Sequence, residues 1–109
     1  MAFDENLAMD IRAALAGQDG ITEKKMFGGL SFLLKGNMAC GVIADELIVR
    51  VGPDATDEAL AQPHTRAFDF TGTPMKGWVV VGAGGYEKDA DLKRWVQQGV
   101  DFASSLPPK

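Results

Sequence analysis

Residues 30–53 read LSFLLKGNMACGVIADELIVRVGP and contain three short apolar segments separated by small or polar residues. The candidate strands are LSFLLK (30–35), MACGVIA (38–44) and ELIVRV (46–51), and the turn signals are Gly36-Asn37, Asp45-Glu46 and Gly52-Pro53. Gly36 and Asn37 favour a two-residue hairpin turn, because both accept the positive φ angles that such turns require. The stretch therefore predicts antiparallel strands joined by short turns.

Helical patterns lie on both sides of this stretch. Apolar residues recur at helical spacing near the N-terminus and again near the C-terminus, and a short acidic segment follows Pro53. The first predicted helix is capped by Asp4, ends at Gly17 and Gly20, and has an apolar face formed by Phe3, Leu7, Ile11, Ala14 and Leu15. The second is a short helix over DATDEALA (54–61) that Pro63 stops. The third is capped by Asp89, ends before Pro107, and has an apolar face formed by Leu92, Trp95, Val96, Val100, Phe102 and Ala103.

Two further strands are predicted over RAFDF (66–70) and WVVVG (78–82), around the turn TGTP (71–74). The predicted order of helices and strands along the chain is α-β-β-β-α-β-β-α. Helices that are segregated from antiparallel hairpins indicate a two-layer α+β fold, with a sheet of about five strands and the helices on one side. With 109 residues and 46% apolar composition, we expect a single domain over residues 1–109.

Composition excludes several classes of protein. A net charge of −4 argues against direct nucleic-acid binding, because phosphate contacts need clustered Lys and Arg. A single cysteine, Cys40, excludes an intrachain disulfide. No apolar run approaches the roughly 20 residues of a membrane span, and the N-terminus is acidic where a signal peptide is basic. We therefore expect a cytoplasmic protein with no membrane partner.

Two glycine motifs are candidates for phosphate or cofactor loops, and neither fits. In WVVVGAGGYE (78–87), the third glycine of a dinucleotide-binding turn would fall at Glu87, so we interpret the segment as a flexible connection. In KKMFGGL (24–30), the lysines precede the glycines and a strand follows, unlike a P-loop. Gly28 and Gly29 instead predict a bulge or tight bend between two paired segments.

No catalytic constellation stands out. Cys40 and His64 could form a nucleophilic dyad if the fold joined them, but an apolar strand favours a buried Cys40 and the end of a short helix favours a solvated His64. No second histidine or thiolate cluster completes a metal site. We therefore predict no enzymatic activity, no cofactor and no metal.

Five cations lie within or beside strand-like segments: Lys24, Lys25, Arg50, Arg66 and Lys76. An inward-facing Arg50 would need a partner, because its guanidinium keeps its charge. The sequence is compatible with two arrangements of Arg50 and Lys76. Arg50 and Lys76 either lie along an exposed sheet face with their stems over apolar surface, or they line a modest cationic groove for an acidic segment of a partner.

Three stretches carry a resemblance to a known family: KKMFGGLSFLLKGNMACGV (24–42), ELIVRVGPD (46–54) and FTGTPMKGWVVV (70–81). Together they resemble the N-terminal domain of the TfoX family, also called Sxy, which includes regulators of competence genes. The most specific parts are Met26-Phe27-Gly28-Gly29 and Met75-Lys76-Gly77-Trp78, with Arg50 and Gly52 between them.

The resemblance implies a two-layer α+β fold similar to the secretion-chaperone class, and regulation through protein contacts, with better-known members acting alongside the cyclic-AMP receptor protein. It supplies no catalytic residues. Family regulators usually add a C-terminal helical domain, which this sequence lacks, so we expect a stand-alone N-terminal domain.

We therefore predict a regulatory or adaptor domain that binds another protein, with homodimer formation as one form of that contact. The alternative is a small-molecule or anion-binding domain, with or without enzymatic activity, that uses a pocket near Arg50 and Lys76. The candidate binding residues are Lys25, Phe27, Gly28, Gly29, Arg50, Lys76 and Trp78.

Overall fold

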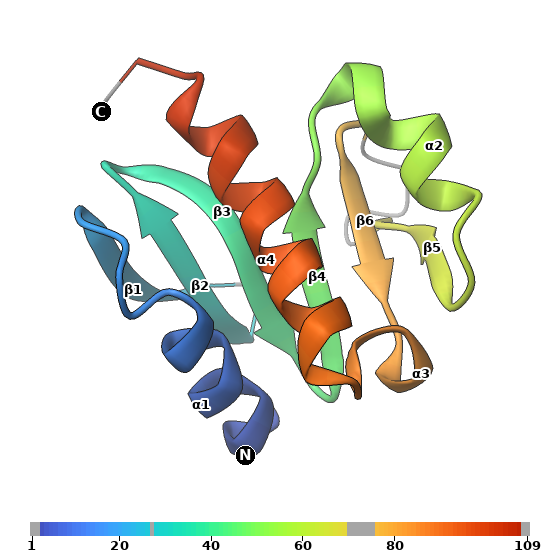
Figure 1. Ribbon diagram of the computed structural model, residues 1–109, viewed down its shortest axis with the longest axis horizontal. Helices are drawn as coiled ribbons and strands as arrows, with labels where there is room; N and C mark the ends of the chain where they lie inside the picture. The colour runs from blue at the N-terminus through green and yellow to red at the C-terminus, as the bar shows by residue number, and fades with distance from the viewer. Residues whose placement is uncertain (1–2, 27, 70–75, 108–109) are drawn as a thin grey trace.

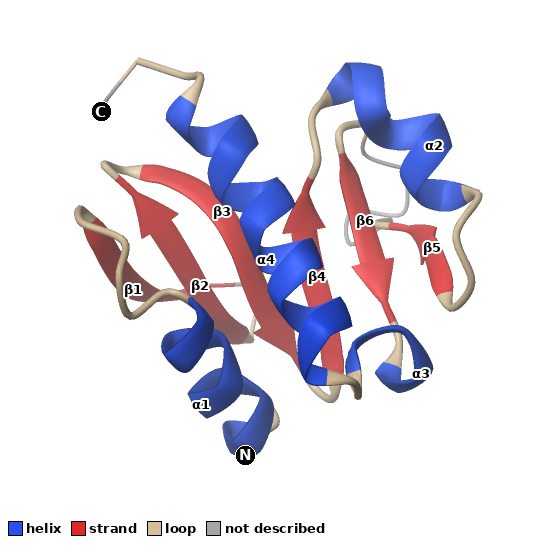
Figure 2. Ribbon diagram, in the orientation of Figure 1, coloured by secondary structure: helices blue, strands red, loops and turns tan. Residues whose placement is uncertain are grey.

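The computed structural model describes residues 3–26, 28–69 and 76–107. The elements in chain order are α1 (Glu5–Ala14), β1 (Ile21–Met26), β2 (Gly29–Leu34), β3 (Asn37–Ile43), β4 (Glu46–Arg50), the 3-10 helix η1 (Pro53–Ala55), α2 (Thr56–Leu60), β5 (Thr65–Ala67), β6 (Trp78–Val81), α3 (Ala83–Tyr86) and α4 (Asp89–Ser104). The strands form one antiparallel sheet in the order β1-β2-β3-β4-β6-β5. α1 and α4 lie side by side over one face of this sheet, and α2 lies over the same face near β5 and β6 (Figures 1 and 2). The predicted α+β class is therefore confirmed.

The sheet contains six strands rather than about five, because β1 adds a strand to the predicted set. β1 pairs with β2 along its whole length, from Ile21 opposite Leu34 to Met26 opposite Gly29. The bend predicted at Gly28 and Gly29 is thus the tight turn of the β1–β2 hairpin, with Gly28 at a φ of 76°. The turn predicted at residues 71–74 lies outside the described residues.

Several other boundaries differ from the sequence prediction. β5 ends at Ala67, so Phe68 and Asp69 of the strand predicted over residues 66–70 are not part of it. The β2–β3 hairpin exists, but its two-residue turn is Lys35-Gly36, one position earlier than predicted, and both residues have positive φ. The segment after β6 is the short helix α3 rather than a flexible connection. α4 begins at Asp89 itself, so Lys88 is the N-cap residue.

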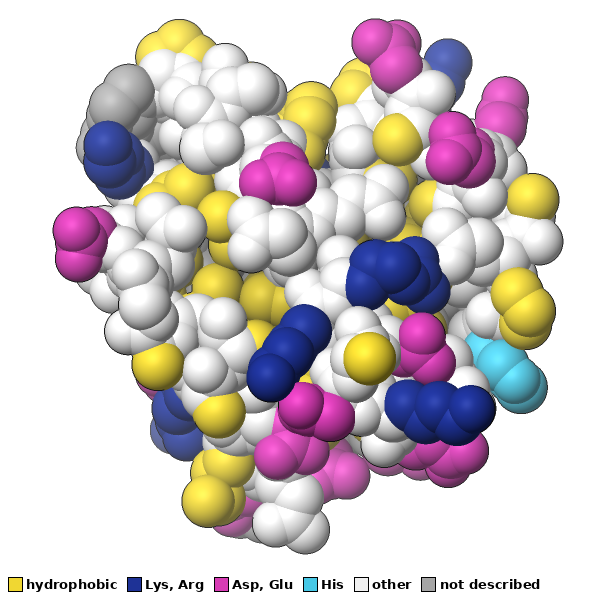
Figure 3. Space-filling model, viewed as in Figure 1, with side chains coloured by type: hydrophobic (Ala, Val, Ile, Leu, Met, Phe, Trp, Pro, Cys, Tyr) yellow, Lys and Arg dark blue, Asp and Glu magenta, His cyan; other side chains and the backbone are white. Residues whose placement is uncertain are grey.

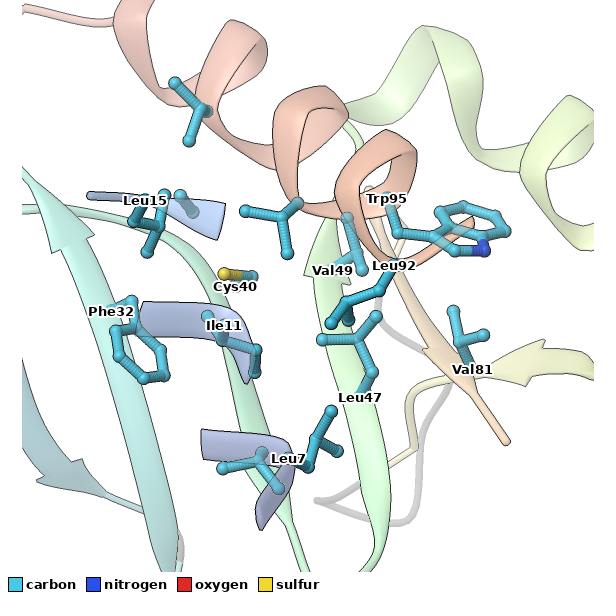
Figure 4. Packing of buried hydrophobic residues seen from close by; sticks show 14 of the residues in the cluster. Leu7, Ile11, Leu15, Phe32, Cys40, Leu47, Val49, Val81, Leu92 and Trp95 are labelled. Carbon is cyan, nitrogen blue, oxygen red and sulfur yellow. The ribbon is translucent and has the colours of Figure 1, made fainter. Parts of the chain in front are cut away.

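The main core lies between the sheet and the helices α1 and α4. It includes Ile11 from α1, Phe32 and Val49 from the sheet and Trp95 from α4, each no more than 1% exposed (Figure 4). α1 begins where its sequence predicts, since the carboxylate of Asp4 accepts hydrogen bonds from the backbone N–H groups of two first-turn residues. A smaller apolar cluster lies on the other sheet face, formed by Met38, Ile48, Phe68 and Val80. Among the described residues, no helix has both the length and the apolar character that crossing a bilayer requires.

Candidate functional site

The end of β4 and the start of β6 place a cation between two aromatic rings. Arg50 is paired with Trp78 across these two strands. The guanidinium carbon of Arg50 lies 5.2 Å from the centroid of the Trp78 ring and 5.3 Å from that of the Phe102 ring on α4. Both distances are within the range of cation–π attraction. We call these three side chains the arginine clamp.

The guanidinium of Arg50 has no anionic partner in the described part of the chain. The ion pairs found there use other cations, Arg12, Arg66 and Lys93. Arg50 is only half-buried, and its planar fork of N–H donors matches the two oxygens of a carboxylate. The arginine clamp therefore presents a pre-oriented cation that an external carboxylate could engage.

A compact hydrogen-bond network holds the two strand ends together beside the clamp. The carbonyl oxygen of Gly77 accepts hydrogen bonds from the backbone N–H groups of Val51, at 2.8 Å, and Gly52, at 3.0 Å. The hydroxyl of Thr56, which is 6% exposed, donates to the carbonyl of Gly52 and accepts from the N–H of Gly77, both at 2.8 Å. This network joins the segment after β4 to the segment before β6.

Gly52 lets the helix approach the end of β4 closely. Its φ is 91°, which disfavours residues with a side chain. A Cβ at Gly52 would also lie 2.5 Å from two carbons of the Phe102 ring. The absence of a side chain therefore allows Phe102 to sit over the backbone at Gly52 and reach Arg50.

The predicted site residues are divided between two ends of the sheet. Arg50 and Trp78 meet directly, and Lys76 is exposed one residue before the network residue Gly77. Lys25, Gly28 and Gly29 lie at the opposite end, where Gly29 is packed against Val42 and Ile43 beside the β3–β4 hairpin (Figure 1). The last predicted residue, Phe27, lies outside the described residues.

The sequence prediction missed two residues of this site. Phe102 was predicted only as part of the apolar face of the last helix, and Thr56 was assigned no role. A half-buried aromatic residue at the edge of a helical stripe is one signal for Phe102. Thr56 gave no local signal, because its two partners lie 4 and 21 residues away in the chain.

Cys40 and His64 do not form a dyad. Cys40 lies on β3 inside the main core (Figure 4), and burial raises the pKa of its thiol to about 12. His64 directly precedes β5, which is separated from β3 in the sheet by β4 and β6. The described residues also contain no group of three or more His, Cys, Asp or Glu side chains arranged to hold a metal ion.

Comparison with known proteins gives one match. The family model described as the TfoX N-terminal domain matches residues 13–103. These residues include every element from β1 to β6, and the arginine clamp with its hydrogen-bond network. No curated protein and no solved structure matches the chain.

Proposed function

This chain belongs to the TfoX N-terminal domain family, and from that membership we propose that it is a non-enzymatic regulatory or adaptor domain that acts by binding another protein. The family is linked to competence regulation, and we place this chain's role in the control of transcription or competence. Its net charge of −4 disfavours a role that depends on direct contact with nucleic acid.

The observation that carries this proposal is the arginine clamp. A half-buried guanidinium held against Trp78 and Phe102, without a carboxylate neighbour in the described chain, keeps N–H donors available to an outside acceptor. Arg and aromatic residues are also the side chains most enriched at the centres of protein interfaces. We infer that an Asp or Glu side chain of a partner binds Arg50, with exposed Lys76 at the rim.

The direct test is capture of a partner from native cells by the wild-type domain and by Arg50 variants. We expect a stoichiometric partner with the wild type, strong loss with Arg50→Met, and partial loss with Arg50→Lys, which keeps the charge but not the planar fork. Lys93→Met is the matched control, because it removes an exposed cation that pairs only with Asp89 of its own helix in the described structure.

Thermal unfolding of each variant separates loss of binding from loss of folding. Equal capture by the wild type and by folded Arg50→Met would contradict the proposal. Recovery of the domain alone would contradict it as well, and recovery only of further copies of this chain would assign the clamp to a homodimer.

A small carboxylate or phosphate is the second candidate occupant, favoured by the same unpaired guanidinium. Ligands that bind only the folded state raise its melting temperature. A panel of phosphates, nucleotides and carboxylates should then stabilise the wild type but not Arg50→Met. A flat response over the panel would leave the protein partner as the remaining proposal.

A further inference from the structure

A second candidate site lies near the other end of α4, about 12 Å along the helix from Phe102 at the usual rise per residue. It is an open cavity of about 300 Å³ where the segment before β5 meets α3 and the first turns of α4. This volume is at the lower limit of small-molecule pockets. The residues that matter for the argument are Gln62, His64, Gly84, Asp91 and Arg94.

His64 forms one side of the cavity. His64 has a φ of 65°, in the left-handed region that is uncommon for residues other than glycine and in which histidine is one of the more frequent exceptions. Its carbonyl accepts a hydrogen bond of 2.8 Å from the N–H of Gly82, which fixes the backbone there. Its ring lies on Gly84, where a Cβ would stand 2.6 Å from the Cε1 atom of the ring. The glycines after β6 thus let this imidazole pack at the cavity.

The other side of the cavity carries one acidic and one basic side chain, which form no ion pair with each other. Asp91 and Arg94 are three residues apart on α4, so they are neighbours on its surface. Neither takes part in an ion pair with another described residue. Arg94 instead lies over the ring of Trp95, with its guanidinium carbon 4.8 Å from the centroid. Around this helical face, Lys and Arg side chains alternate with acidic ones (Figure 3).

We propose that this cavity binds a small zwitterion of the α-amino acid class. Arg94 binds the ligand's carboxylate and Asp91 its ammonium group, while His64 and Gln62 close the sides. A simple anion would be repelled by Asp91 and a simple cation by Arg94, whereas a zwitterion satisfies both. The two charges of an α-amino acid are one carbon apart, which suits two side chains on adjacent turns. The site is separate from the arginine clamp and does not depend on it.

Titration of the isotopically labelled domain with the free amino acids, followed by NMR, tests the proposal. We expect saturable shifts at His64, Gly84, Asp91 and Arg94 with at least one amino acid. Affinity should fall at least about tenfold, a loss of about 1.4 kcal/mol, in both Arg94→Gln and Asp91→Asn. Lys93→Gln, whose side chain lies outside the cavity, should bind as the wild type does.

Ligand analogues supply the second arm of the test. The N-acetyl derivative and the amide of the bound amino acid should each lose binding, because each lacks one of the two charges. Thermal unfolding must show that both cavity variants are folded. The proposal is overturned if no amino acid causes saturable shifts at millimolar concentration, if acetate binds as well as the amino acid, or if the folded Arg94 and Asp91 variants keep wild-type affinity.

Discussion

Gly99, in the middle of α4, lies directly against the backbone of Ala39 in β3. A Cβ at Gly99 would stand 2.3 Å from the carbonyl oxygen of Ala39 and 3.0 Å from its carbonyl carbon. Backbone atoms in the centre of a sheet cannot move aside as a flexible side chain can. The distance between α4 and the sheet is therefore set by the absence of one methyl group.

Gly99→Ala should destabilise the domain even though alanine favours helices. The helix must shift off the sheet, and overpacking of this kind costs about 1–3 kcal/mol; over most of this range the cost is larger than the gain of about 1 kcal/mol in helix propensity. Chemical denaturation measures the difference. Gly17→Ala is the control, because nothing lies within 4 Å of a Cβ there, and it should change stability little. Equal stability of Gly99→Ala and the wild type would refute the close contact.

Thr56 should be sensitive to loss of its hydroxyl and tolerant of loss of its methyl. Thr56→Val keeps the shape but leaves the N–H of Gly77 without the hydroxyl partner and removes one of the hydrogen bonds to the carbonyl of Gly52, so we expect a loss of about 1–3 kcal/mol in unfolding free energy. Thr56→Ser keeps both hydrogen bonds and should cost less. Urea denaturation of the two variants gives the comparison, and a larger loss for Thr56→Ser would rule out the bridging role.

Two surface ion pairs should make the domain less stable in acid. Hydrogen bonds from Arg12 to Glu23 and from Arg66 to Glu46 lower the pKa of each carboxyl below its usual range. A lowered pKa in the folded state contributes stability above the ordinary carboxyl pKa, and that stability is lost as pH falls through the folded-state value. Because the side chains are partly exposed, each pair contributes about 0.2–1 kcal/mol.

The predicted loss of stability in acid can be checked by measuring the unfolding free energies of Glu23→Gln and Glu46→Gln from neutral to acidic pH. Each variant should be less stable than the wild type at neutral pH and should approach it in acid. Glu58→Gln, which removes an exposed carboxylate outside the described ion pairs, should follow the wild type throughout. A constant difference between the glutamine variants and the wild type at every pH would contradict the assignment.

Cys40 should resist alkylation in the folded protein. Complete burial excludes the reagent, and a pKa of about 12 keeps the thiol protonated at neutral pH. Labelling should be at least about a thousandfold slower than in the unfolded chain, since typical opening free energies exceed 5 kcal/mol. Mass spectrometry follows the rate, and Cys40→Ala carrying the exposed Ser104→Cys is the fast-reacting control. Rapid labelling of native Cys40 would show that the β3 region opens easily.

The sheet could be predicted where its strands are apolar and its turns carry typical residues. β2, β3 and β4 meet both conditions. β1 does not, because it is an edge strand whose exposed Glu23 pairs with Arg12 of α1 instead of entering the core. Its residues, ITEKKM, therefore lack the alternation of a half-buried strand.

The turns and the site show a second limit of sequence reasoning. Lys35 and Ala44 have positive φ although neither residue type favours it, so the exact turn positions depend on strand register. Arg50 and Trp78 could be singled out by residue type and family resemblance. Their convergence with Phe102 could not, because it requires α4 to approach the end of β4, a contact between segments far apart in the chain.

The strand order β1-β2-β3-β4-β6-β5 also bears on how the protein is made. Among the first four strands, each pairing joins sequence neighbours, so these strands can form hairpins while the chain leaves the ribosome, and β4 pairs with β6 later. β5 has no partner until β6 has been synthesised, and the part of the apolar sheet face that α4 covers stays exposed until α4 has been synthesised. A nascent chain stalled before Asp89 would therefore expose the part of its future core that α4 covers, and this sixteen-residue helix is the segment whose synthesis closes the core.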